Sequence, residues 1–248
     1  TGYPNVRKFT VAHGVVTGGE YAFRVSAVNF NGAGPASAAV VLAICAEPGF
    51  LAPPRLDAVT ETTMLLGWAP PVGDGGCRIL SYALLIDDGA GGPLAPLDPA
   101  TVADRPTLRA YAVTAFTSAD TGKTFRFLLQ ASNRIGATES REASFVLAAV
   151  PGRPAAGPLL DLPATSTTRI GVLYPALAVG EDGGAPVLSY ELQMYDYPSS
   201  SWASLVGGPA SPSLATSFTQ QGLAKGRSYM FRYRAWNVNG AGPFSDAS

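Results

Sequence analysis

The sequence predicts an all-β chain of tandem antiparallel β-sandwiches, and three observations lead to this class. Residues 229–237 read Tyr-Met-Phe-Arg-Tyr-Arg-Ala-Trp-Asn, so apolar or small side chains alternate with longer, mostly basic ones. A period of two is typical of a strand with one buried and one solvated face. The pattern recurs at residues 21–29 and 125–133, and the final asparagines Asn29, Asn133 and Asn237 are 104 residues apart. Short β-type runs separated by glycine and proline fill the rest of the chain, without helical periodicity.

The repeat predicts three units along the chain, because its length is that of a small domain. Residues 1–46 are expected to be the C-terminal part of a domain, and residues 47–149 a complete domain. Residues 150–248 are expected to be a further domain that lacks its last strand. The linkers at 46–49 and 150–154 are short and contain proline, so the array should be extended, with contacts only between sequence neighbours.

The expected strands follow from β-type runs bounded by turn residues. In the first unit they cover residues 7–12, 21–29 and 38–45. In the second they cover residues 53–56, 63–68, 79–86, 108–116, 125–131 and 144–149, with an irregular stretch at 98–106. In the third, residues 169–174 and 187–192 match 63–68 and 79–84, and the strand from residue 229 follows.

A set of aromatic residues recurs at matching places in the repeats. Trp68 and Tyr174 occupy the second strand, Tyr82 and Tyr190 the third, and Leu223, Gly226 and Tyr229 form a Leu-x-x-Gly-x-x-Tyr corner. With the Tyr-x-Phe-Arg-x-x-Ala-x-Asn strand and the Gly-x-Gly-Pro-x-Ser segment, each repeat resembles a fibronectin type III domain, an immunoglobulin-like sandwich. The resemblance implies a core signature of seven residues: Tyr21, Trp68, Tyr82, Phe125, Tyr174, Tyr190 and Tyr229.

The middle repeat departs from this family pattern at its corner. Phe125 replaces the corner tyrosine, and Ala119 replaces the corner leucine. This loses the hydroxyl's hydrogen bond but keeps a ring for the core, where Phe127 and Leu129 are also expected. The sequence motif Asp-Gly-Gly-x-x-x-Leu-Ser-Tyr further resembles tandem type III arrays in large surface proteins of ciliated protists.

Composition and motifs exclude several classes of function. The formal net charge is −1 and no Lys/Arg cluster occurs, so neither nucleic acid nor an anionic membrane surface is an expected partner. The longest apolar run, residues 38–46, is too short to enter a membrane as a span. His13 is the single histidine, and the carboxylate pairs at 87–88 and 181–182 sit in turns. We therefore expect no enzyme activity, no metal and no cofactor.

The face of the last strand leaves two interpretations open. Arg24, Arg232 and Arg234 alternate along their strands, and Trp236 follows. The arginines either stack on Trp236 as a cation–π ladder or form a solvated strand face.

The two cysteines are expected to form a disulfide, given the type III resemblance. Cys45 ends the first unit, and Cys77 lies in the loop between the second and third strands of the next. In a type III sandwich that loop sits at the pole where the chain enters. At the next linker the corresponding residues are Ala149, or Ala148 one register away, and Ala185, so both cysteines are absent together. The alternative is two unrelated, buried small side chains.

These observations predict that the chain is a structural or adhesive spacer array in a large extracellular or cell-surface protein, with a cilium as one candidate location. Its partners would be other protein chains or neighbouring repeats of the same chain. An intracellular axonemal or cytoskeletal scaffold, or accessory domains of a larger receptor or enzyme, remain alternatives. A formed disulfide would favour an oxidising compartment.

Overall fold

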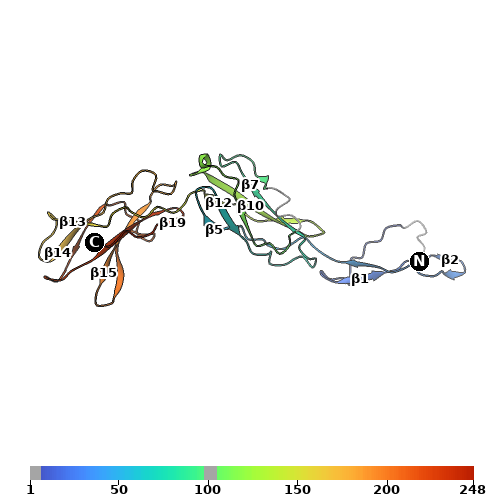
Figure 1. The fold of residues 1–248 in the computed structure, drawn as a ribbon. Helices are drawn as coiled ribbons and strands as arrows, with labels where there is room; N and C mark the ends of the chain where they lie inside the picture. The colour runs from blue at the N-terminus through green and yellow to red at the C-terminus, as the bar shows by residue number, and fades with distance from the viewer. Residues whose placement is uncertain (1–6, 98–104) are drawn as a thin grey trace.

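The computed structural model describes residues 7–97 and 105–248, so most of the stretch expected to be irregular at 98–106 lies outside it. Three units follow one another in an extended row (Figure 1). The N-terminal unit and the C-terminal sandwich lie at opposite ends and flank the middle sandwich. The only helical element in the described residues is a single 3₁₀ turn, η1 (Ser118–Asp120).

The middle sandwich consists of two antiparallel sheets. The first has the order β5-β6-β9, formed by β5 (Arg55–Val59), β6 (Met64–Gly67) and β9 (Ala110–Val113). In the second, β10 (Thr124–Ser132) lies centrally and pairs with three strands. These are β7 (Ser81–Ile86), β11 (Ala137–Glu139) and β12 (Ala143–Val146), and β7 also pairs with β8 (Ala95–Pro96).

The core of the middle sandwich is built by the inward side chains of both sheets. Trp68 has 2% of its surface exposed, and its ring centroid lies 5.9 Å from that of Tyr82. Phe125, Phe127 and Leu129 alternate along β10 and are all buried, which is the period of two expected for a half-buried strand. Burial of these large side chains provides the main stabilisation of the unit.

The C-terminal sandwich repeats this arrangement around a separate core. One sheet has the order β13-β14-β17: β13 (Leu159–Asp161), β14 (Arg169–Leu173) and β17 (Ser217–Gln221). The other has the order β16-β15-β18-β19: β16 (Ser201–Val206), β15 (Ser189–Asp196), β18 (Phe231–Asn237) and β19 (Gly240–Ala241). Tyr174, Tyr190 and Tyr233 are buried between the sheets, with the rings of Tyr174 and Tyr233 5.4 Å apart. The predicted all-β fold of antiparallel sandwiches is therefore confirmed.

The N-terminal unit differs from the sequence prediction. The strand expected over residues 21–29 is divided into β1 (Glu20–Phe23), which pairs with β4 (Val40–Ala43), and β2 (Val28–Asn29), which pairs with β3 (Gly32–Ala33). Residues 7–12 form no strand. In the middle sandwich β7 pairs with β10 over six residues, whereas no described strand occupies that place beside β1 and β2. A strand without that neighbour has fewer ladder hydrogen bonds to keep it regular.

A serine begins the closing segment of all three units. The backbone N–H of each serine donates to a backbone oxygen at 2.8 Å, and the serine side-chain oxygen accepts the N–H of the same partner residue. The pairs are Ser37 with Val25, Ser140 with Leu129 and Ser245 with Tyr233. In the C-terminal sandwich Ser248 continues the pairing, since its N–H lies 2.9 Å from the Phe231 oxygen. Residues 245–248 therefore run along β18 although no ladder strand is present there.

Candidate functional site at the joints between units

Two joints connect the three units, and each is organised by the last residue of a central strand or the residue after it. At the first joint, between the N-terminal unit and the middle sandwich, this residue is Asn133, which follows β10 and is 7% exposed. Its Nδ2 donates to the Ala46 oxygen of the linker at 2.7 Å and to the Asp74 oxygen of the β6–β7 loop at 2.8 Å. Its Oδ1 accepts the N–H groups of Ile135 and Gly136. One buried amide thereby fastens the linker to the sandwich that follows.

The second joint, between the middle and C-terminal sandwiches, repeats this arrangement. Asn237 ends β18, is 4% exposed, and donates from Nδ2 to the Ala149 oxygen at 2.7 Å and the Asp182 oxygen at 3.0 Å. Its Oδ1 accepts the N–H of Asn239 at 2.9 Å. The Asn239 amide in turn donates to the oxygens of Val146 and Ala148 in the preceding sandwich. We call the hydrogen bonds from the asparagine amide to the linker and to the loop the clamp. At this joint Asn239 adds a second set of hydrogen bonds between the two units.

Glycine is required where the loop between the second and third strands meets the linker. Gly75 and Gly183 both have positive φ, +71° and +76°. A Cβ on Gly75 would lie 2.2 Å from the Ala46 oxygen, and one on Gly183 would lie 2.4 Å from the Ala149 oxygen. No side chain fits at either position, because real Cβ atoms do not approach other atoms so closely.

The next glycine of each loop lies directly against the preceding unit. A Cβ on Gly76 would lie 2.4 Å from the Gly18 nitrogen, and one on Gly184 would lie 2.3 Å from Thr121 Cγ2. Gly18 and Thr121 belong to the turns before β1 and β10. The loop glycine therefore contacts the backbone of the preceding unit at the first joint and the Thr121 side chain at the second.

A disulfide joins Cys45 to Cys77 across the first joint, with 5.6 Å between the Cα atoms. The second joint can be aligned with it through backbone hydrogen bonds: Ala46 N to Gly75 O corresponds to Ala149 N to Gly183 O. Cys45 then corresponds to Ala148, which resolves the register that the sequence left open, and Cys77 corresponds to Ala185. Both alanines are buried, so the second joint holds the same geometry without a covalent bond.

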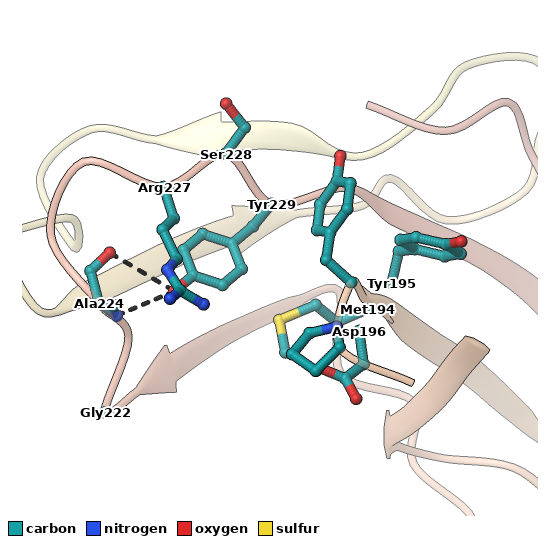
Figure 2. A pocket seen from close by; sticks show the side chains of 10 residues that line it. Met194, Tyr195, Asp196, Gly222, Ala224, Arg227, Ser228 and Tyr229 are labelled. Atoms are coloured by element: carbon teal, nitrogen blue, oxygen red, sulfur yellow. Dashed lines mark hydrogen bonds between the residues drawn. The ribbon is translucent and has the colours of Figure 1, made fainter. Parts of the chain in front are cut away.

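Corner tyrosines hold the turns before β1 and β18. Tyr21 accepts the Val16 N–H on its hydroxyl at 2.9 Å, and Tyr229 accepts the Ala224 N–H at 2.8 Å (Figure 2). Phe125 has no hydroxyl, and its ring packs 4.7 Å from that of Phe116. The corner hydrogen bond is thus present in two units and absent from the middle one.

A carboxylate fastens the middle turn in place of that hydroxyl. Asp120 accepts hydrogen bonds from Lys123 Nζ at 2.7 Å and from the backbone N–H and hydroxyl of Thr117. The bonds from Lys123 and Thr117 lower the pKa of Asp120 to about 2. The sequence did not reveal this substitute for the corner tyrosine.

The outer sheet face of the C-terminal sandwich carries a cation–π ladder. The Arg232 guanidinium lies 4.1 Å from the Trp202 ring centroid and 4.0 Å from that of Phe244. Arg234 lies 4.2 Å from Phe244 and 4.9 Å from Trp236. Of the two interpretations of this face, the ladder is the one the structure contains, although Phe244 and Trp202 join it rather than Arg24.

Glu191 lies under this ladder and was missed by sequence reasoning. It is 5% exposed and accepts hydrogen bonds from Ser204 Oγ at 2.6 Å, Arg234 Nε at 2.7 Å and Trp236 Nε1 at 3.0 Å. Burial alone would raise the pKa of Glu191, but the hydrogen bonds from Ser204, Arg234 and Trp236 outweigh it and lower the pKa. The only sequence signal was a carboxylate beside Tyr190 on a β-type run.

A cavity of about 630 Å³ lies at the outer pole of the C-terminal sandwich, between the tip of the β15–β16 hairpin and the turn before β18 (Figure 2). Tyr195, Tyr197, Tyr229, Arg227 and Asp196 line it. Asp196 is its only carboxylate, and it contains neither histidine nor cysteine. This lining provides contact surface but no nucleophile with an adjacent base.

The other polar residues considered for catalysis or metal binding are either exposed or paired within the fold. His13 is exposed at a bend, and Asp87 is buried in an ion pair with Arg126 Nε at 2.9 Å. Within residues 7–97 and 105–248, no group of three His, Cys, Asp or Glu side chains could hold a metal ion. No helix in this part of the chain is long and apolar enough to cross a membrane.

Comparison with known proteins finds partly similar relatives, one of which is named for a fibronectin type III domain. No protein-family model matches the chain. It is 29% identical over 199 residues to a titin homolog of Caenorhabditis elegans, which is 78% of this chain and 1% of that protein. It is 29% identical to human myomesin-2 over 96% of this chain and 16% of the relative. It is 28% identical to human fibronectin type-III domain-containing protein 3A, over 91% of this chain and 17% of the relative.

Among solved structures, the chicken CNTN1 FN1-FN3 domains match with a TM-score of 0.48 and 16% identity, over 92% of this chain and 73% of that one. The chain spans less than a fifth of the length of each of these curated relatives. The sheet orders described above define the fold class as all-β, built from antiparallel sandwiches.

Proposed function

We propose that this chain is a structural or adhesive spacer segment of a larger protein, acting through contacts between its own units and with other protein chains. The observation that carries the proposal is the recurrence of one joint: a buried asparagine, a Gly-Gly loop and a short linker meet in the same way twice. A chain selected only for two independent sandwiches would not need the same inter-unit contacts at both linkers. The similarity to much longer proteins, one of them named for a fibronectin type III domain, supports the same role.

The three units are, in this proposal, the C-terminal part of one type III domain over residues 1–46, a complete domain over 47–149 and a further domain over 150–248. The seven signature aromatics serve the cores and corners of these domains. Catalysis, a cofactor, nucleic-acid binding and membrane insertion form no part of the proposed role, in line with a net charge of −1 and a single histidine.

The proposed location is outside the cell or at its surface, with a cilium as the narrower candidate. The Cys45–Cys77 disulfide supports an oxidising compartment, since such bonds are rare in reducing ones. The decisive experiment is alkylation of the protein in intact cells, followed by mass spectrometry of the two cysteine peptides. A linked pair is the expected result. Two alkylated thiols would favour the intracellular scaffold instead.

The spacer role itself is tested by small-angle X-ray scattering of the whole chain. We expect a single elongated form whose maximum dimension does not change with salt, because the joints are fastened by buried groups. A distribution of compact and extended forms would contradict a rigid spacer.

A further inference from the structure

A cavity of about 440 Å³ lies at the first joint, beside the disulfide. Glu20 and Ala43 of the N-terminal unit form one side of its lining, and Arg78, Leu80 and Arg134 of the middle sandwich form the other. Cys77 is part of the same lining, so the disulfide holds the two sides together. The cavity therefore depends on the relative placement of two units.

The two arginines of this cavity have donors to spare. Within the described residues, neither Arg78 nor Arg134 has a carboxylate oxygen within 4 Å. Arg134 donates one N–H to the Ala43 oxygen, which orients its guanidinium across the joint. Glu20 is the only carboxylate in the lining, so the cavity has a net positive charge.

The second joint shows that these charges are not needed to build a joint. By the register described above, Arg78 corresponds to Pro186, Arg134 to Val238 and Glu20 to Thr124. The same clamp and Gly-Gly loop form there without them. The arginines and the disulfide are thus additions found together at the first joint alone.

We propose that the cavity at the first joint binds a carboxylate side chain from an acidic segment of a protein partner. An arginine guanidinium matches a carboxylate with two parallel hydrogen bonds, and two arginines from separate loops can grip it from two sides. Leu80 and Ala43 offer apolar surface for the methylene groups of that side chain. A long polyanion fits less well, because Glu20 adjoins the arginines and the chain has no basic stripe beyond them.

The inference goes beyond the spacer role, since a rigid spacer does not need a bound ligand. It is tested with a fluorescein-labelled peptide of sequence Gly-Glu-Glu-Leu-Gly, titrated with the whole chain and followed by fluorescence anisotropy. The matched probe is the peptide with glutamine in place of glutamate. We expect saturable binding of the glutamate peptide only, weakening as salt is raised.

The variants locate the site. Arg78 makes no hydrogen bond or ion pair with the described residues. Arg78→Ser and the double variant Arg78→Ser/Arg134→Ser should weaken binding, the double by about tenfold or more. Arg169→Ser, the same change at an exposed position on β14 of the C-terminal sandwich, should leave affinity within twofold, and scattering should show each variant still extended. Unchanged affinity of the double variant would overturn the proposal, as would no saturable binding at millimolar peptide. Binding of a heparin tetrasaccharide in place of the peptide would assign the cavity to a glycan and equally overturn it.

Discussion

Replacing Asn237 with alanine should loosen the second joint and destabilise the C-terminal sandwich. The substitution removes three hydrogen bonds, to the oxygens of Ala149 and Asp182 and from the N–H of Asn239. At about 0.5–1.5 kcal/mol net for each of the three bonds, the expected loss is about 1.5–4.5 kcal/mol. The bonds to Asp182 and Asn239 act within the sandwich, whereas the bond to Ala149 holds the linker.

Both consequences can be measured on one protein. Urea unfolding, followed by fluorescence of Trp202 and Trp236, reports the free energy of unfolding of the C-terminal sandwich. Residual dipolar couplings report the orientation of the two sandwiches, which should become variable in the variant. Asn31→Ala is the matched control, because Asn31 is exposed and its contact in the hairpin is made by its backbone N–H.

The first joint supplies an internal comparison for this prediction. Asn133→Ala removes the equivalent clamp, but the Cys45–Cys77 bond still spans that joint. The orientation there should stay fixed until the disulfide is reduced. A loss below about 0.5 kcal/mol for Asn237→Ala, together with unchanged couplings, would refute the view that the asparagine fastens the joint.

Three further changes test other parts of the structure. Ala148→Cys/Ala185→Cys should form a second disulfide and stabilise the chain by about 4 kcal/mol; a thiol titration that finds both groups free would contradict the matching of the joints. Trp68→Ala should cost about 3–5 kcal/mol in chemical denaturation, because a large buried ring is lost; a cost near zero would mean that Trp68 is not part of the core. The folded-state pKa of Glu191 is lowered, so its stabilisation is present above the ordinary value of 4.5 and is lost as pH falls through the folded pKa. Glu191→Gln should therefore flatten the acid limb of stability against pH, and an unchanged limb would show that Glu191 does not contribute to it.

Some strands could be predicted and others could not, for a physical reason. β10 and β18 alternate strictly over seven or more residues, and such alternation is a local property that the sequence contains. β16 and β17 were missed because Ser201–Val206 lacks an alternation of period two and Ser217–Gln221 is largely polar; both segments become strands by pairing with β15 and β14. The predicted strand at 21–29 is divided although its pattern was right, and within the described residues no strand pairs with it in the way that β7 pairs with β10.

The cation–π ladder on the outer face of the C-terminal sandwich shows the same limit of sequence-based prediction. The alternation of Arg232 and Arg234 was visible, but the choice between a stacked and a solvated face was not. Trp202 and Phe244 decide it, and they reach the arginines from β16 and from the segment after β19. Contacts between segments cannot be read from either segment alone.

The sequence by itself determined the all-β class and the repeat, because alternation, turn residues and equal spacing are properties of the chain. It favoured a bond between the two cysteines but left two unpaired side chains as the alternative, which the structure decided. It marked Asn133 and Asn237 only as the ends of a repeated strand. Tertiary structure alone made them clamps, since the oxygens that they bind lie 55 to 88 residues away along the chain. The side chains of the joint were thus visible in the sequence, whereas their partners are brought near only when the linker, the Gly-Gly loop and the central strand meet at one pole.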